Sequence, residues 1–204
     1  MRGRRRRGRA SARDAGRLIL ASASPRRARI LESLGVGFDV VVASVDERLL
    51  AGEAAATAAE RLARTKALAV AAHRRRPVLA ADTVVVLGRR VLGKPRSRRE
   101  ALAMLGALAG RRHVVITGVC LVADGRVFSG IESTEVRFTP LSPEEARWYV
   151  GTGEPMDKAG AYHVDGLGAL FVRSISGSPS NVEGLPVTLV RRLARRAGLR
   201  LLAP

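Results

Sequence analysis

The chain has 204 residues, a length typical of one domain, and 47% of them are hydrophobic although only 3% are aromatic. A core must therefore be built mainly from aliphatic side chains, and global disorder is excluded. The single cysteine permits no internal disulfide, and no apolar stretch approaches the roughly 18 to 20 residues of a membrane-spanning helix. We expect a cytoplasmic protein of a reducing compartment, with no membrane partner.

The formal net charge is +18, and the 36 basic residues comprise 33 Arg and only three Lys. Residues 1–17 hold eight of these Arg against one Asp and show no apolar periodicity. This pattern predicts a solvated, disordered tail that precedes one domain over residues 18–204. Two functional interpretations of the tail stay open: nonspecific attraction to nucleic acid or acidic lipid, and a targeting segment.

The first half of the domain predicts alternating strands and helices. The run LILAS from Leu18 favours a buried strand, and Ser24 followed by proline favours a helix that ends at Gly35. A second apolar run over residues 38–43 precedes an Ala-rich segment, 53–72, whose composition favours helix. This order is typical of an α/β protein.

Residues 78–87 form the most β-branched run of the chain, and a single carboxylate, Asp82, interrupts it. A charge inside a buried strand is costly. Asp82 must therefore be paired, bound to metal, or placed at a strand end that faces a cleft.

The second half predicts a β hairpin between two capped helices, then loops and a final amphipathic helix. The expected elements are a helix over 97–109 started by Ser97, a hairpin of strands 113–122 and 126–138 joined at Asp124-Gly125, a helix after Ser142, a strand near 169–175 and a helix after Pro186. Together the segments predict one α/β domain with a helix-covered sheet and an antiparallel section.

The segment SASPRR, residues 22–27, is a candidate anion-binding turn. A strand that enters a Ser-rich turn and a helix start directs free backbone N–H groups toward an anion, and Arg26 and Arg27 add forked donors suited to phosphate. The structural alternative is an ordinary N-cap with two solvated arginines.

Two acidic pairs, Asp46-Glu47 and Asp82-Thr83, follow or interrupt predicted strands. Carboxylates on neighbouring strand ends can share Mg²⁺ or Mn²⁺, which also neutralises nucleotide phosphates. The alternative for Asp46-Glu47 is a polar loop.

The only lysines are Lys66, Lys94 and Lys158. A compact ammonium fits into a crowded phosphate channel, whereas a planar guanidinium does not. The three lysines are therefore candidates for phosphate binding, and the alternative is that they occur at these positions by chance. We expect Lys66 to share one helix face with Leu62 and Ala69.

The loops AGAYHVDG (159–166) and SPSNVEGLP (178–186) offer close backbone approach and the polar groups of Tyr162, His163 and Asp165. An ordinary loop is the alternative. The three histidines lie far apart without metal-ligand spacing, and no P-loop or Rossmann motif is present, so those classes are disfavoured.

Over about residues 18–200 the chain resembles the Maf family, the septum-formation-inhibitor-like nucleoside triphosphate pyrophosphatases. The motifs that carry the resemblance are SASPRR (22–27), ADTVV (81–85), GKP (93–95), HVVITG (113–118), EPMDKAGAY (154–162) and NVEGLP (181–186). The resemblance implies a two-lobed mixed sheet with flanking helices, as in inosine triphosphate pyrophosphatases, with the substrate between the lobes. It also implies metal-dependent hydrolysis of a nucleoside triphosphate to monophosphate and pyrophosphate, in the branch that acts on dTTP and UTP.

By the same resemblance, Asp82 would be the proton acceptor and would hold the metal with Glu47. The residues implied to bind substrate are Ser22, Ser24, Arg26, Arg27, Lys66, Thr83, Lys94 and Asp165. Asp165 stands where the dTTP/UTP branch commonly has Gln, and an ionised carboxylate accepts hydrogen bonds but donates none, so the base would be read differently.

Two alternative functions stay open at this point. One is the family branch that acts on 7-methyl-GTP, which usually shows Trp in place of the first Arg of the SPRR motif. Another is a basic nucleic-acid-binding protein, although two Tyr, four Phe and one Trp provide few stacking platforms. A homodimer would also fit the resemblance.

Overall fold

The computed structural model describes residues 17–201, which form a seven-stranded mixed sheet flanked by helices. The sheet has the order β2-β1-β3-β5-β6-β7, with β4 paired to β3. The strands are β1 (Leu18–Leu20), β2 (Phe38–Val40), β3 (Val78–Leu87), β4 (Arg90–Leu92), β5 (Arg112–Ala123), β6 (Arg126–Phe138) and β7 (Val172–Ser176). The α-helices are α1 (Pro25–Ser33), α2 (Ala55–Ala71), α3 (Arg98–Leu108), α4 (Pro143–Gly151), α5 (Pro179–Val182) and α6 (Val187–Arg196), and three 3₁₀ turns are η1 (Glu154–Asp157), η2 (Ala159–Ala161) and η3 (Leu167–Phe171).

The mixed α/β architecture predicted from the sequence is confirmed. Strand β1 pairs in parallel with β2 and β3, whereas β3, β5, β6 and β7 pair antiparallel in succession. The β5–β6 hairpin turns at Asp124 and Gly125, whose φ angles of 49° and 73° are those of the type I′ turn that Asp-Gly favours.

The tail predicted for residues 1–17 lies outside the described residues except for its last member. Arg17 donates hydrogen bonds to the carbonyl of Phe38 (2.6 Å) and to Asp39 Oδ1 (2.9 Å). The folded body therefore begins one residue earlier than the sequence predicts. Within residues 17–201, none of the helices is both long and apolar enough to cross a membrane.

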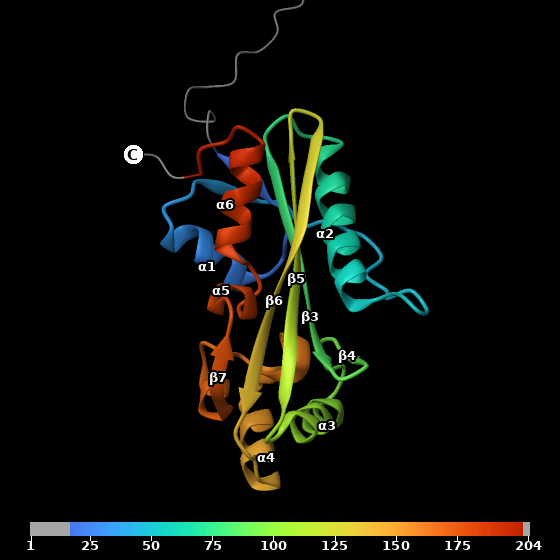
Figure 1. Cartoon of the computed structure of the whole chain (residues 1–204), viewed down its shortest axis with the longest axis vertical. Helices are drawn as coiled ribbons and strands as arrows, with labels where there is room; N and C mark the ends of the chain where they lie inside the picture. The colour runs from blue at the N-terminus through green and yellow to red at the C-terminus, as the bar shows by residue number, and fades with distance from the viewer. Residues whose placement is uncertain (1–16, 202–204) are drawn as a thin grey trace, which may run out of the picture.

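The helices divide the molecule into two lobes along the long central strands (Figure 1). In the upper lobe α2 covers one face of the sheet, and α1 and α6 cover the other; α3, α4 and β7 surround the lower end. The apolar core has three parts to match, one under α1 and α6, one under α2, and one in the lower lobe.

Helix α2 packs by a face that differs from the prediction. Leu62 and Lys66 are buried as expected, but Ala69 is exposed and Val70 is buried instead. Residues four apart stay on one stripe of a helix, so 62, 66 and 70 face the sheet together. The prediction for Ala69 was wrong. This residue lies three positions after Lys66, and that spacing places its side chain at the edge of the buried stripe.

Strand β3 passes through both lobes, and this positions the site. Ala80 and Ala81 pack into the two upper parts of the core, whereas Val85 packs into the lower part. Asp82 and Thr83 fall at the crossing between lobes. The one acidic residue of this strand therefore lies where the packed core is interrupted.

Gly118 of β5 pairs with Asp82 in the sheet and lies directly under α2. A Cβ atom at this position would lie 2.3 Å from the backbone C and O atoms of Ala59. Only glycine lets the helix approach the sheet this closely.

We predict that Gly118→Ala lowers the free energy of unfolding by at least about 2 kcal/mol, because helix backbone must shift to admit the methyl group. Gly106→Ala is the matched control: Gly106 lies within α3, and a methyl group at this position would meet no atom of another segment within 4 Å, so alanine should stabilise by roughly 0.5 to 1 kcal/mol. Urea unfolding of both variants measures the difference. Equal effects would contradict the close approach of α2.

Candidate active site

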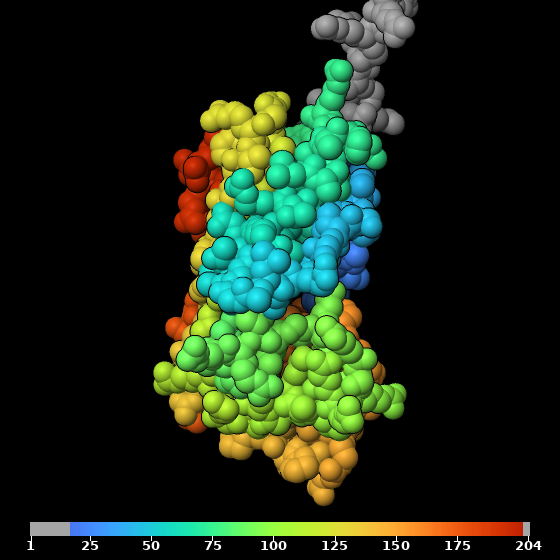
Figure 2. Space-filling view, turned by 90° about the vertical axis from the view of Figure 1, so that its right-hand side faces the viewer, coloured from blue at the N-terminus to red at the C-terminus, as the bar shows by residue number. Residues whose placement is uncertain are grey.

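A cavity of about 320 Å³ lies between the two lobes. It opens between the segment that precedes α2 and the residues of β4 and α3, cyan and green in Figure 2. Its walls come from the β1–α1 turn, the segment before α2, helix α2, strands β3 and β5, strand β4 with the residues after it, and the loops near residues 158–164 and 182–184. All three lysines of the chain, Lys66, Lys94 and Lys158, line this one cavity.

One side of the cavity carries two carboxylates that share a cation. Lys66 Nζ lies 2.6 Å from Asp82 Oδ1 and 2.7 Å from Glu47 Oε2. Asp82 and Lys66 retain only 8% and 7% exposure, respectively. Because an unpaired charge at this depth would be strongly destabilising, the shared ammonium is what allows Asp82 to be ionised within an apolar strand.

The donor set fits a divalent cation of the Mg²⁺ or Mn²⁺ type. The side chain of Lys66 already gathers oxygens of Glu47 and Asp82 around a single positive charge. Among residues 17–201 no group of three or more His, Cys, Asp or Glu is arranged to hold a metal. Mg²⁺ is commonly bound by one or two carboxylates together with water and substrate phosphates, so these two residues suit a cation that binds with the nucleotide.

The β1–α1 turn forms the adjoining wall. Ser24 occupies the N-cap position of α1 with an extended backbone, but its side chain makes no capping hydrogen bond. Ser24 and Arg26 both line the cavity. The first turn of α1 thus places a positive helix end and a free hydroxyl beside the cavity, as the SASPRR motif predicts.

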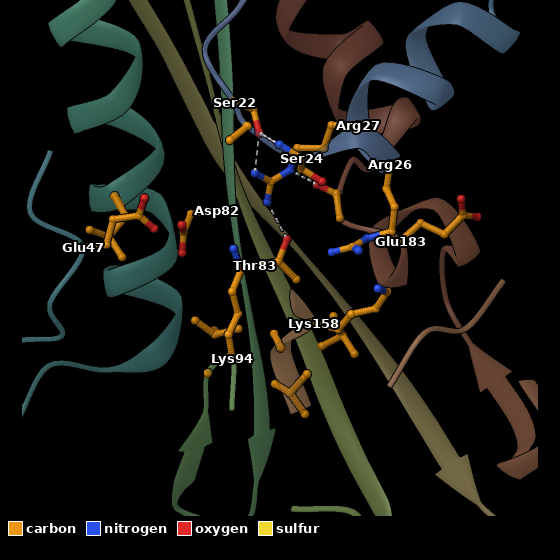
Figure 3. Close-up of a pocket in the computed structure, with 18 of the residues that line it drawn as sticks. Ser22, Ser24, Arg26, Arg27, Glu47, Asp82, Thr83, Lys94, Lys158 and Glu183 are labelled. Carbon is orange, nitrogen blue, oxygen red and sulfur yellow. Dashed lines mark hydrogen bonds between the residues drawn. The ribbon is translucent and has the colours of Figure 1, made fainter. Parts of the chain in front are cut away.

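Arg27 is buried and held by three acceptors. Its Nε donates to the carbonyl of Gly184 (2.8 Å), Nη1 to Ser22 Oγ (3.1 Å) and Nη2 to Thr83 Oγ1 (3.0 Å). Figure 3 shows these hydroxyls on either side of the guanidinium. Burial lowers the pKa of Arg27, and the nearby charge of Asp82 opposes that effect. Ser22 and Thr83, predicted as substrate-binding residues, line the cavity but act here as acceptors that orient Arg27.

A buried network extends this support across the sheet. The hydroxyl of Thr83 lies 2.9 Å from that of Thr117, which donates to the carbonyl of Asn181 (3.1 Å). The Asn181 amide in turn donates to the carbonyl of Val115 and to Thr134 Oγ1. Thr117 and Asn181 belong to the HVVITG and NVEGLP motifs, but sequence reasoning did not select them as site residues, because their contacts depend on how the strands and loops meet.

The opposite side of the cavity is rich in cations (Figure 3). Arg26 Nη1 lies 3.2 Å from Asp157 Oδ2. Lys158 pairs with the same Asp157 and donates to the carbonyl of Glu154 (2.9 Å). Lys94 lines the cavity from the residues after β4 and is exposed. Lys158 was absent from the predicted substrate-binding set, although the scarcity of lysine pointed to it.

Asp165 is exposed and does not line the cavity. Its neighbours His163 and Val164 do, as does Glu183, a second residue missing from the predicted set. Burial, followed by the charge of Asp165, raises the pKa of Glu183. The structure therefore does not place Asp165, predicted as a substrate-binding residue, in the wall of the cavity.

Tyr162, which lines the cavity, is backed by a buried histidine. His113 Nε2 lies 2.9 Å from the Tyr162 hydroxyl, and the two rings meet edge to face. His113 retains 2% exposure, and burial lowers its pKa to about 4. The imidazole is therefore neutral in the folded protein at pH 7.

We predict that this histidine destabilises the fold on acidification. Between pH 6.5 and about 4 the unfolded chain takes up a proton that folded His113 does not, so stability falls as the pH is lowered through this window. The effect amounts to about 2 to 3 kcal/mol at pH 4.5. Urea unfolding at pH 7 and 4.5 should show a smaller loss for His113→Gln than for the wild type. Identical losses of unfolding free energy in the two proteins would contradict a lowered pKa of His113 in the folded state.

Cations from four segments and a carboxylate pair face one cavity at the crossing of a mixed α/β sheet. Such a site is of the class that suits a phosphorylated ligand. The family model described as Maf-like protein matches residues 17–197. The chain therefore belongs to the Maf-like protein family.

Individual relatives are similar over most of their length. The chain is 51% identical over 191 residues to a dTTP/UTP pyrophosphatase of Anaeromyxobacter dehalogenans (strain 2CP-C), which covers 92% of this chain and 97% of the relative. It is 52% identical over 173 residues to a dTTP/UTP pyrophosphatase of Symbiobacterium thermophilum, covering 83% and 88%. A solved nucleoside-triphosphatase (dITP/XTP pyrophosphatase) of Mycobacterium abscessus overlaps 60% of this chain and 72% of its own, with 20% identity and a TM-score of 0.40. The family assignment rests on the sequence matches alone.

Proposed function

We propose that this protein hydrolyses dTTP and UTP to the nucleoside monophosphate and pyrophosphate. The observation that carries the proposal is the Lys66 ammonium shared by Glu47 and Asp82 in a cavity that Arg26, Arg27 and the other lysines also line. Relatives about 50% identical over most of the chain bear the name dTTP/UTP pyrophosphatase. The branch that acts on 7-methyl-GTP is the alternative within the family.

In this proposal Asp82 accepts a proton from the attacking water. Its Oδ1 is occupied by Lys66, whereas Oδ2 accepts no hydrogen bond from residues 17–201. One oxygen is therefore fixed and the other is available as a base at the cavity wall. The wall contains no cysteine, and neither of its serines, Ser22 and Ser24, hydrogen-bonds to a carboxylate or imidazole within residues 17–201, so direct attack by water suits the site better than a covalent intermediate.

The cations orient the triphosphate. Arg27 is held before substrate arrives, Arg26 and Lys158 lie across the cavity from Asp82 (Figure 3), and Lys94 also lines the cavity. Fixed positive charge around a transferring phosphoryl group is a main source of rate enhancement in such reactions. A divalent cation held by Glu47 and Asp82 would neutralise phosphate charge and favour ionisation of water.

The base would lie against the loop that carries His163 and Val164, with Asp165 at the rim. Asp165 would influence base preference through its negative charge, because its side chain is outside the wall. The substrates and the single buried cysteine, Cys120, both suit the cytoplasm.

The experiment is a nucleotide panel run on wild type and on Asp165→Gln with Mg²⁺ or Mn²⁺. The panel contains dTTP, UTP, dGTP and 7-methyl-GTP. We expect wild type to release monophosphate and pyrophosphate, with the highest kcat/KM for dTTP and UTP. Asp165→Gln should change the ratio of kcat/KM among these nucleotides, since it removes a negative charge beside the wall residues His163 and Val164. Release of orthophosphate would refute the reaction type.

Asp82→Asn is the control for the catalytic assignment. It keeps the shape of the side chain but removes the base, so kcat should fall by roughly 10² to 10⁴. Unchanged turnover in this variant would remove Asp82 from its role.

A further inference from the structure

Residues 42–52, which we call the strap, connect β2 to α2 along the edge of the cavity. Val42, Ala43, Glu47 and Leu49 of the strap line the cavity. Figure 1 shows this connection running beside α2 to its N-terminal end, away from the sheet. The strap thus brings Glu47 to the site without belonging to the sheet or to a helix.

The backbone of the strap is not fastened to the body. Val41, just before it, donates to the carbonyl of Leu20 (3.1 Å). After this bond, the only backbone–backbone hydrogen bond that involves residues 42–52 joins the Glu53 amide to the carbonyl of Leu50 (3.2 Å), within residues 17–201. Side chains must therefore hold the strap in place.

Arg61 of α2 supplies the principal attachment. Its Nε and Nη2 each lie 2.7 Å from one carboxylate oxygen of Glu53, a two-pronged ion pair. Nη2 also donates to the carbonyl of Arg48 (3.1 Å). The Glu53 carboxylate accepts from the Leu50 amide (3.3 Å) as well. One guanidinium therefore fixes both ends of the segment 48–53, directly after Glu47.

The pair between Lys66 and Glu47 is a weaker attachment. The Glu47 side chain is 55% exposed, whereas that of Glu53 is 9% exposed. Exposed ion pairs contribute little because water screens them, and forked pairs with a desolvated carboxylate are stronger. Glu47 therefore contributes less to the position of the strap than the pair between Arg61 and Glu53 does.

We propose that Arg61 is a positioning residue, which fixes the strap so that Glu47 faces Lys66 and Asp82. Arg61 does not line the cavity, so it acts through the strap and not on substrate. Lysine cannot replace it fully, because the contacts with Glu53 and Arg48 use the planar fork of a guanidinium. Where the test uses turnover or Mn²⁺ binding with a dTTP analogue, the inference rests on the proposed function; the trypsin readout does not.

The test compares Arg61→Ala and Arg61→Lys with wild type and with Arg64→Ala. Arg64 lies on the same helix, donates to Ser129 Oγ (3.1 Å) and is outside the cavity, so its loss is a matched control. Limited trypsin digestion followed by mass spectrometry monitors the Arg48–Leu49 bond. Mn²⁺ binding in the presence of a non-hydrolysable dTTP analogue is measured by electron paramagnetic resonance, and kcat is measured at saturating Mg²⁺.

For Arg61→Ala we expect cleavage at Arg48–Leu49 about tenfold faster and Mn²⁺ binding about tenfold weaker, the usual range when a support of a metal ligand is lost. The kcat at saturating Mg²⁺ should stay within about twofold of wild type, since Asp82 is untouched. Arg61→Lys should lie between wild type and Arg61→Ala, and Arg64→Ala should match wild type.

If trypsin cleavage and Mn²⁺ binding were unchanged in both Arg61 variants, the inference would be wrong. That result would not contradict the hydrolysis of dTTP by wild type. If wild type hydrolysed no nucleotide but the Arg61 variants still differed in trypsin cleavage, the proposed function would fail and the positioning role would stand. A loss of kcat at saturating Mg²⁺ in both Arg61 variants, together with unchanged Mn²⁺ binding, would also contradict the positioning role.

Discussion

One ammonium group shared by two carboxylates is the constraint on which the rest of the site depends. Asp82 lies in the middle of an apolar strand, and its charge is tolerated because Lys66 reaches it from α2. Lys66 can do so because α2 packs against the backbone of β5 at Gly118, the sheet partner of Asp82. The absence of a side chain at Gly118 on β5 thus permits the buried ion pair between Lys66 and Asp82 on the neighbouring strand β3.

The arginine side of the cavity follows a different principle, rigidity by hydrogen bonding. Arg27 is fixed by acceptors from the β1–α1 turn, β3 and the segment after α5, and the hydroxyls of Thr83 and Thr117 continue the network to Asn181. The motifs SASPRR and NVEGLP, far apart in the chain, therefore support the same guanidinium. Preorganised donors of this kind need little reorganisation when a polyanion binds.

The sequence predicted well those features that local chemistry determines. Strand β3, the Asp-Gly hairpin turn and the helix starts at Ser24, Ser97 and Ser142 are all confirmed. The unusual rarity of lysine pointed to Lys158 as well as Lys66 and Lys94. Each signal depends on a single residue or a short run, so no knowledge of distant contacts was needed.

Features set by tertiary packing were harder to predict. Ala69 was assigned to the wrong stripe of α2, and Glu183 was not selected because its place in the wall depends on how the loop after α5 meets β3. Asp165 lies outside the wall although its two predecessors in the chain line it. Loop residues alternate between wall and solvent over one or two positions, and a sequence motif does not specify which of them face inward.

In the reaction that we propose, the carboxylates gathered by Lys66 direct water to the α-phosphorus of the nucleotide. Hydrolysis of dTTP in ¹⁸O-labelled water, followed by mass spectrometry of both products, tests it most directly. We predict one labelled oxygen in the nucleoside monophosphate and none in pyrophosphate. Label in pyrophosphate would place the attack on the β-phosphorus and contradict the arrangement of Asp82, Lys66 and the cations described for this cavity.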